Sequence, residues 1–415
     1  MNSNTTQGVS RRSFMRILGA ASAAATSLPA FAMQQPGVQA TAQPTRRLAR
    51  SIQFPPDTVV ISANENPLGP AQSALTAISS IGAQGGRYHF DEYSKTVAVF
   101  NEQFDLKNDY TAMFPGSSEP LDLALMSNIG PDKPLVYGDP SYEQGPRAAD
   151  RMNAPKIPVP LTAATYAHDV RAMVKAHPSP GAYYIVNPNN PTGTMTPKAD
   201  LVWLVNNKPK GSVVIIDEAY HHFCDDESCI DLVRQDRDVI VMRTFSKIYG
   251  MAGLRAGFAI ARPDLIERFN TVGGSNQGVA SVSVTTTAAA RASLQDKDLV
   301  PLRKKINSDI RSETLEFLTK HGYKVVPGSR GNMFMVDVKR PGREFQAAML
   351  KENVAIGRTW SAMPSYVRVT VGTKTEMEKF QTAFVKCMDL PPGAVNGAAA
   401  LHLPEFYVPS ELYRG

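Results

Sequence analysis

Lys247 lies in a segment whose residue types could bind a phosphorylated carbonyl compound. In RTFSKIYGMAGLRAGFAIA, residues 243–261, the lysine follows Thr244 and Ser246, and Arg255 comes eight residues after it. A primary amine can attack a carbonyl group, and a guanidinium fork suits a phosphate. A lone lysine is most often an ordinary surface residue, so this interpretation depends on the chemistry that the rest of the chain places nearby.

Other polar residues follow short apolar runs. The runs are DYTAMFPGSSEP, PLVYGDPSYEQ, AYYIVNPNNPTG, SVVIIDEAY and DVIVMRTFSK. Such runs suit strands buried on both faces, with helices as crossovers, so the sequence predicts an α/β fold with a mostly parallel sheet flanked by helices. Ligands of these sheets bind beyond the carboxyl ends of the strands. The residues at those ends are Ser117, Ser118, Tyr142, Asn190, Asp217, Tyr220 and Lys247. Any one of them could be a turn or cap residue, but seven together favour a ligand site.

One part of this set suits a phosphate. Ser117 and Ser118 stand just before the helix-like LDLALM, and the free N–H groups at the start of a helix bind anions. Thr244 and Ser246 add hydroxyl groups, and Arg255 adds a guanidinium. We therefore expect these five residues to hold a phosphate group.

The rest of the set suits a charged aromatic ring. Asp217 follows the apolar run VVII, where a carboxylate needs a cationic or hydrogen-bonding partner. A protonated heterocyclic nitrogen would serve, and the ring of Tyr142 could stack on such a heterocycle. A phosphate, a pyridinium and the amine of Lys247 together indicate pyridoxal 5'-phosphate bound covalently to the lysine.

These segments resemble those of the fold-type-I pyridoxal-phosphate aminotransferases of class I and II, and most closely the histidinol-phosphate aminotransferase family. The matching motifs are NENPLGP at 64–70, RYHF at 87–90, NPNNPTG at 187–193, IIDEAY at 215–220, TFSKIYGMAGLRAGF at 244–258 and YVRVTVGT at 366–373. The resemblance runs from about Ser62 to about Leu390. It implies a large cofactor-binding domain, a smaller α+β C-terminal domain and a homodimer.

The resemblance also implies a role for each matching residue of the cofactor site. Lys247 would bind the cofactor and move a proton to and from the substrate, while Asp217 would keep the ring nitrogen protonated. Asn190 and Tyr220 would lie at the phenolic oxygen of the ring, and Tyr142 would stack on its face. The residues implied for the phosphate are Ser117, Ser118, Thr244, Ser246, Arg255 and, from a neighbouring subunit, Tyr88.

Four further residues are implied near the substrate. Arg368 would bind the substrate α-carboxylate through two hydrogen bonds, and Asn66 and Asn332 match positions nearby. Arg358 stands where the histidinol-phosphate family has an arginine for the substrate phosphate, which implies substrates with a second anionic group. In the alternative interpretation, Arg358 packs on Trp360 or pairs with a nearby carboxylate.

Other chemistries of the same pocket stay open at this point. The cofactor would equally serve a lyase, a decarboxylase or a racemase, and a periplasmic binding protein could keep the pocket without turnover. The leading hypothesis is an aminotransferase that exchanges an amino group between an amino acid, or a histidinol-phosphate-like amine, and a 2-oxo acid. An intact set of Lys247, Asp217 and Arg368 argues against a mere binding protein, which needs no amine at the reacting carbon.

The start of the chain resembles a twin-arginine signal peptide. Arg11 and Arg12 precede Phe14 and an alanine-rich apolar run that ends at Ala30-Phe31-Ala32, a small-x-small cleavage pattern. The run is too short and too weakly hydrophobic for a membrane anchor. We therefore expect a periplasmic mature protein, with an amphipathic N-terminal helix of a cytoplasmic protein as the alternative.

The predicted segments are a signal at 1–32, a spacer and N-terminal arm at 33–63, the large domain at 64–288, the small domain at 289–390 and a tail at 391–415.

Composition excludes several other classes. A formal charge of +6 over 415 residues, without a run of like charges, gives no indication of nucleic-acid binding. The three cysteines lack the spacing of a zinc site, so no metal site is predicted. Cys224 and Cys229 lie close enough in sequence that either a disulfide or two free thiols is possible in an oxidising compartment.

Overall fold

The computed structural model describes residues 54–273, 281–391 and 393. The predicted signal peptide, most of the predicted spacer and nearly all of the predicted tail therefore lie outside the described residues. Among the helices of the described part, none combines the length and the apolar character needed to cross a membrane.

A seven-stranded sheet forms the centre of the larger part of the fold. Its strands, in spatial order, are β2 (Thr111–Phe114), β8 (Gly257–Ile260), β7 (Val239–Thr244), β6 (Val213–Asp217), β5 (Ala182–Val186), β3 (Leu135–Asp139) and β4 (Lys156–Pro160). The pairs from β7 to β4 are parallel, and β8 runs antiparallel to both β7 and β2. The prediction of a mostly parallel sheet is confirmed.

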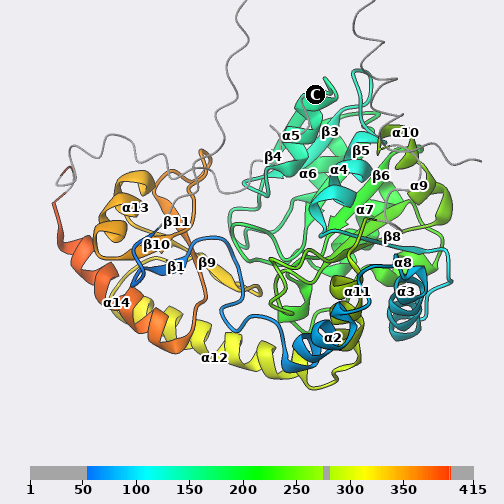
Figure 1. Cartoon of the computed structure of the whole chain (residues 1–415). Coiled ribbons are helices and arrows are strands. Elements are labelled where there is room, and N and C mark those ends of the chain that lie inside the picture. Colours follow the sequence, from blue (N-terminus) through cyan, green and yellow to red (C-terminus); the bar gives the residue numbers. More distant parts are fainter. Residues whose placement is uncertain (1–53, 274–280, 392, 394–415) are drawn as a thin grey trace, which may run out of the picture. The chain divides into compact units, whose positions relative to one another are not determined.

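Helices cover both faces of this sheet, as Figure 1 shows for the part coloured from cyan to green. Alternate residues of β6 belong to different hydrophobic clusters. Val214 lies in the cluster that contains Phe100 and Leu204, whereas Ile215 lies in the cluster that contains Leu121 and Ala148. Burial on both faces explains why β5, β6 and β7 read as continuous apolar runs. The helices of this part are α2 (Gln72–Gly82), α3 (Phe90–Phe104), α4 (Ser118–Met126), α5 (Gln144–Arg151), α6 (Val170–Ala176), α7 (Lys198–Asn207), the 3-10 helix η1 (His221–Phe223), α8 (Ile230–Arg234), α9 (Pro263–Glu267), α10 (Asn270–Gly273) and α11 (Val284–Gln295).

The smaller part contains two short sheets and three helices. Strand β9 (Met333–Asp337) pairs antiparallel with β11 (Tyr366–Thr370), and β1 (Val59–Ile61) pairs in parallel with β10 (Val354–Ile356). In Figure 1, β1 in blue lies beside β10 in orange, although almost three hundred residues separate them in sequence. The helices are α12 (Leu299–Lys320), α13 (Gly342–Lys351) and α14 (Lys374–Asp389), and α14 begins with a capping box of Thr373 and Glu376.

Two of the predicted domain boundaries do not coincide with the ends of elements in the structure. The predicted arm at 33–63 contributes β1, whose Val59 and Ile61 lie in the hydrophobic core of the smaller part. The predicted boundary between residues 288 and 289 falls inside α11, which packs against α2 and α3 of the larger part. Helix α11 continues past residue 288 because its buried face, which includes Ala289, Ala290 and Ser293, extends beyond that residue.

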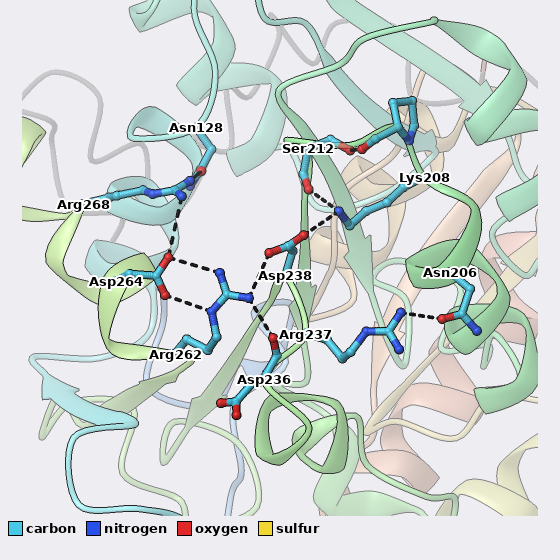
Figure 2. A network of polar contacts seen from close by, with 11 residues as sticks. Asn128, Asn206, Lys208, Ser212, Asp236, Arg237, Asp238, Arg262, Asp264 and Arg268 are labelled. Atoms are coloured by element: carbon cyan, nitrogen blue, oxygen red, sulfur yellow. Dashed lines mark hydrogen bonds and ion pairs between the residues drawn. The ribbon is translucent and has the colours of Figure 1, made fainter.

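A network of charged residues lies at the end of the sheet opposite the carboxyl ends of the parallel strands (Figure 2). Asp238, directly before β7, accepts hydrogen bonds of 3.0 Å from Lys208 and from Arg262, which follows β8. Arg262 also binds Asp264 through two hydrogen bonds of 2.9 and 3.1 Å. These charges stabilise the end of β7 that lies away from Thr244, so they are structural and leave the other end of the strand for the ligand.

Candidate active site

Asp217, the last residue of β6, is a buried carboxylate without a cationic contact. It is 4% exposed, accepts a hydrogen bond of 3.0 Å from the Ala219 N–H, and lies 3.4 Å from the Tyr184 hydroxyl. Burial raises the pKa of Asp217 to about 6, against the lowering effects of these hydrogen bonds and of the Lys247 charge. No salt bridge to Asp217 occurs within the described ranges. A protonated ring nitrogen would supply the missing charge partner.

Lys247 lies close to Asp217, in the turn that follows β7. Its Nζ donates a hydrogen bond of 3.3 Å to the Ala63 carbonyl and lies 5.6 Å from the centre of the Tyr220 ring. Burial, and next the charge of Arg368, lower the pKa of Lys247 to about 8. A nucleophilic neutral amine is therefore well populated at mildly alkaline pH.

Tyr220 is oriented by a residue that the sequence patterns did not single out. Its hydroxyl accepts a hydrogen bond of 3.1 Å from the side chain of Asn64, which is fully buried. The Asn64 side chain also accepts a hydrogen bond of 3.0 Å from the Thr370 hydroxyl, and the Asn64 backbone has a left-handed φ of 53°. Asparagine tolerates this conformation better than most residues. The signal was present as the first residue of NENPLGP, but nothing local connected it to Tyr220.

A cradle for a phosphate forms where β2 meets α4. Gly116 has a φ of 89°, and a Cβ there would lie 2.3 Å from a guanidinium nitrogen of Arg255. A Cβ on Gly257 would lie 2.7 Å from the backbone nitrogen of Ser117. Helix α4 then begins at Ser118 without a side-chain cap, which leaves its first N–H groups for an anion.

Two hydroxyl groups lie just before Lys247, on Thr244 at the end of β7 and on Ser246. The Oγ1 of Thr244 accepts a hydrogen bond of 3.1 Å from the Ser246 N–H and lies 3.0 Å from the Ser246 hydroxyl. Both residues are buried. Together with the cradle at Gly116, these groups fit the phosphate of pyridoxal 5'-phosphate, while Asp217 fits its ring nitrogen and Lys247 its carbonyl carbon.

Arg368 lies at the centre of β11 with donors still available. One terminal nitrogen donates a hydrogen bond of 2.7 Å to the Asn190 side chain, and the other donates to the Ser62 carbonyl. The Nε is buried and has no partner in the described part of the chain. Burial lowers the pKa of Arg368 to about 10. Because a guanidinium has five N–H donors, this arrangement still offers a hydrogen-bonding edge to a carboxylate.

Arg358 makes both contacts of the alternative interpretation given above. Its guanidinium donates a hydrogen bond of 2.8 Å to the Glu143 carboxylate and lies 5.3 Å from the centre of the Trp360 ring. Arg368 lies 5.4 Å from the same ring, so Arg358 is near Arg368 while its own charge is already paired with Glu143. Tyr142, the neighbour of Glu143, has a pKa raised to about 12, mainly by burial.

Asn66 and Asn332 position the segment in front of Lys247. The Asn66 side chain donates a hydrogen bond of 3.0 Å to the Ile248 carbonyl. The Asn332 side-chain amide donates hydrogen bonds of 3.1 Å to the carbonyls of Asn64 and Glu65. The side-chain oxygen of Asn332 is buried and has no partner in the described structure. These bonds hold the segment that carries Ala63 against the lysine.

Tyr88 is largely exposed, in contrast to the buried Asp217 and Arg368. It is 79% exposed, and its ring stacks on Phe90 at 5.5 Å. The resemblance assigned it to the site of a neighbouring subunit, and an exposed side chain is compatible with that role.

The described ranges hold neither a cluster of metal-ligating side chains nor a disulfide bond. No group of three or more His, Cys, Asp or Glu side chains could hold a metal ion there. Cys224 and Cys229 are both free thiols, and burial raises the pKa of each.

The chain is similar to known aminotransferases over most of its length. The profile of the aminotransferase class I and II family matches residues 56–384. Histidinol-phosphate aminotransferase 1 from Cupriavidus pinatubonensis is 32% identical over 338 residues, which cover 80% of this chain and 88% of that protein. A crystal structure from Erwinia carotovora atroseptica has a TM-score of 0.75 at 27% identity and covers 81% of this chain and 98% of that one. The histidinol-phosphate aminotransferase of Sinorhizobium meliloti in complex with pyridoxal-5'-phosphate shares the fold, with a TM-score of 0.71 at 20% identity and coverage of 83% and 98%.

Proposed function

Because the chain belongs to the aminotransferases of class I and II, we propose a specific division of roles among its residues during amino-group transfer. The protein is a pyridoxal-phosphate-dependent transaminase that acts on an amino acid and a 2-oxo acid. The observation that carries the proposed roles is the meeting of Lys247, Asp217 and Arg368 in one buried site, each with a pKa moved by burial.

The bound cofactor supplies a carbonyl carbon for the amine and a ring that withdraws electrons from the substrate α-carbon. Lys247 would hold the cofactor and would move the proton from the substrate α-carbon to the former carbonyl carbon of the cofactor. Asp217 would keep a proton on the ring nitrogen. Arg368 would fix the substrate carboxylate, and Asn190 and Tyr220 would bind the phenolic oxygen. Each role places a charge or a donor where the reaction needs it.

A spectroscopic experiment tests this proposal. Purified enzyme loaded with pyridoxal phosphate is mixed with single amino acids, without a 2-oxo acid. We expect the absorbance of the lysine-bound cofactor to disappear, the amine form of the cofactor to accumulate, and one 2-oxo acid to form per site. Release of carbon dioxide would indicate a decarboxylase, racemised substrate would indicate a racemase, and binding without product would indicate a binding protein.

The amino donor belongs to the proposal as well. Several relatives are named histidinol-phosphate aminotransferases, which supports either an amino acid or a histidinol-phosphate-like amine as donor. Arg368 could bind the anionic group of either one. Turnover of each donor with the same 2-oxo acid distinguishes the two.

We propose a homodimer in which Tyr88 completes the phosphate site of the partner chain. Besides Tyr88, three large apolar side chains of the N-terminal part, Leu68, Leu75 and Phe90, are more than 40% exposed. Mixing Tyr88→Ala chains with Lys247→Ala chains tests this proposal. If Tyr88 acts in the partner's site, mixed dimers contain one intact site and recover activity; if it acts in its own site, no intact site forms.

The N-terminal pattern supports export through a twin-arginine route, with a periplasmic mature protein. Replacing Arg11 and Arg12 by Lys should leave the precursor in the cytoplasm with its cofactor bound. Mature protein that begins near Met33 and still reaches the periplasm would contradict this proposal.

A further inference from the structure

Glu143 forms an ion pair beside the residues proposed to bind the substrate. Its Oε2 lies 2.8 Å from a terminal nitrogen of Arg358, and both side chains are about a quarter exposed, 28% and 24%. Glu143 directly follows Tyr142 in the turn after β3, and Arg358 lies in the loop after β10. The pair therefore joins the larger and smaller parts of the fold next to the cofactor site.

Trp360 fixes the distance between this pair and Arg368. The guanidinium groups of Arg358 and Arg368 lie 5.3 and 5.4 Å from the centre of its ring. The indole is 6% exposed, and its Nε1 donates a hydrogen bond of 3.2 Å to the Ser141 carbonyl, so it is not free to turn. A substrate held by Arg368 would thus extend toward a second guanidinium at a fixed separation, across the indole.

The charge of that second guanidinium is already neutralised. An anionic side chain that approached Arg358 would have to displace Glu143 or accept a carboxylate as its neighbour, and like charges in a partly buried site repel. A cationic side chain would meet the guanidinium groups of Arg358 and Arg368, against the single carboxylate of Glu143. An uncharged side chain meets neither penalty.

We propose that Glu143 is a specificity-determining residue that closes Arg358 to a second anionic group, so that preferred substrates carry one carboxylate and an uncharged side chain. This inference rests on the proposed function, because it needs a substrate whose α-carboxylate is bound by Arg368. It differs from the expectation based on Arg358 alone, which favours substrates with two anionic groups.

The test compares amino acids that differ only in side-chain charge. The ratio of kcat/KM for glutamate to that for glutamine, and for aspartate to that for asparagine, is measured with the cofactor-loaded enzyme. Both members of a pair share the α-carboxylate, so the contribution of Arg368 cancels. We expect the wild type to favour the uncharged member and Glu143→Gln to raise the ratio for the anionic member by about tenfold or more, the scale of a charge-assisted hydrogen bond.

Arg358→Gln and the double variant with Glu143→Gln complete a double-mutant cycle. Arg358→Gln leaves Glu143 without its partner and should lower the ratio below that of the wild type, and the double variant should return it close to the wild-type value. Glu352→Gln is the matched control, because Glu352 is 29% exposed and pairs with Lys386 at 2.7 Å on α14, away from this site. It should leave the ratio unchanged.

The outcomes separate this inference from the proposed function. An unchanged ratio in Glu143→Gln, in a variant that still turns over glutamine and unfolds at the wild-type temperature, overturns the role of Glu143. A wild type that favours glutamate over glutamine overturns it too. Failure of the wild type to form a 2-oxo acid from any amino acid would instead reject the proposed function.

Discussion

The Nη1 of Arg368 donates a hydrogen bond of 2.7 Å to the Oδ1 of Asn190. The bond joins the middle of β11 to the loop after β5, 178 residues apart in sequence. It holds the guanidinium in place before a substrate binds, so little side-chain entropy is lost when a carboxylate takes the remaining donors.

Replacement of Arg368 by Lys should weaken substrate binding while it leaves the cofactor in place. Lysine keeps the charge but loses the planar fork, so we expect KM for amino acids to rise by about one to two powers of ten. Steady-state kinetics and cofactor titration measure both effects. Unchanged KM would remove Arg368 from the substrate site, and loss of the cofactor would indicate a structural role.

Replacement of Lys247 by Ala should separate cofactor binding from catalysis. The cradle at Gly116, the Arg255 guanidinium and Asp217 remain, so pyridoxal phosphate should still bind, but without a covalent link and with nearly all turnover lost. Borohydride reduction followed by mass spectrometry checks for the link. A reducible protein–cofactor bond in this variant would mean that another amine carries the cofactor.

The lowered pKa of Lys247 predicts a pH dependence of cofactor attachment. Only the neutral amine attacks the carbonyl, so the rate of covalent capture by cofactor-free enzyme should rise with pH, with a midpoint near 8, and level off above it. Because the charge of Arg368 contributes to the lowering, Arg368→Gln should move the midpoint upward. A wild-type midpoint near the ordinary value of 10.5 would show that the amine is not desolvated in solution.

Replacement of Asp217 by Asn should slow α-proton removal by several orders of magnitude, because an uncharged partner does not keep the ring nitrogen protonated. This loss corresponds to roughly a few kcal/mol of barrier. Single-turnover absorbance measurements follow the step. Tyr184→Phe is the control, since its hydroxyl lies 3.4 Å from the carboxylate and should change the rate far less.

The buried pair of Glu218 and Arg243 should contribute strongly to stability. Their charged groups lie 2.7 Å apart with side chains 2% and 4% exposed, and they join β7 to the residue that follows Asp217. Glu218→Ala leaves the arginine buried and unpaired, at a cost of about 3–5 kcal/mol in the free energy of unfolding. Urea denaturation measures the loss, and Glu352→Ala, which breaks a more exposed pair, should cost less than about 1 kcal/mol.

The sequence alone determined the central sheet and the choice of cofactor, and it predicted most residues of the proposed cofactor site. Apolar runs buried on both faces are visible locally, and residues that directly follow parallel strands necessarily meet at one edge of the sheet. For this reason the chemistry of Asp217, Tyr220 and Lys247 could be inferred together from two separate stretches of sequence. Their hydrophobic flanks, such as VVII before Asp217, also indicated the burial that moves the pKa values.

Only the tertiary structure decided which side chains pair across long sequence distances. The partner of Arg358 is Glu143, 215 residues away, and the residue that orients Tyr220 is Asn64, 156 residues away. Strand β1 likewise pairs with β10, which is distant in sequence, so part of the predicted arm lies in the core of the smaller part. Such contacts depend on how separately formed elements pack, and no local period or motif encodes that packing. The charge state of the substrate pocket is therefore set by tertiary geometry, because a guanidinium attracts an anion only while no carboxylate of the protein already lies against it.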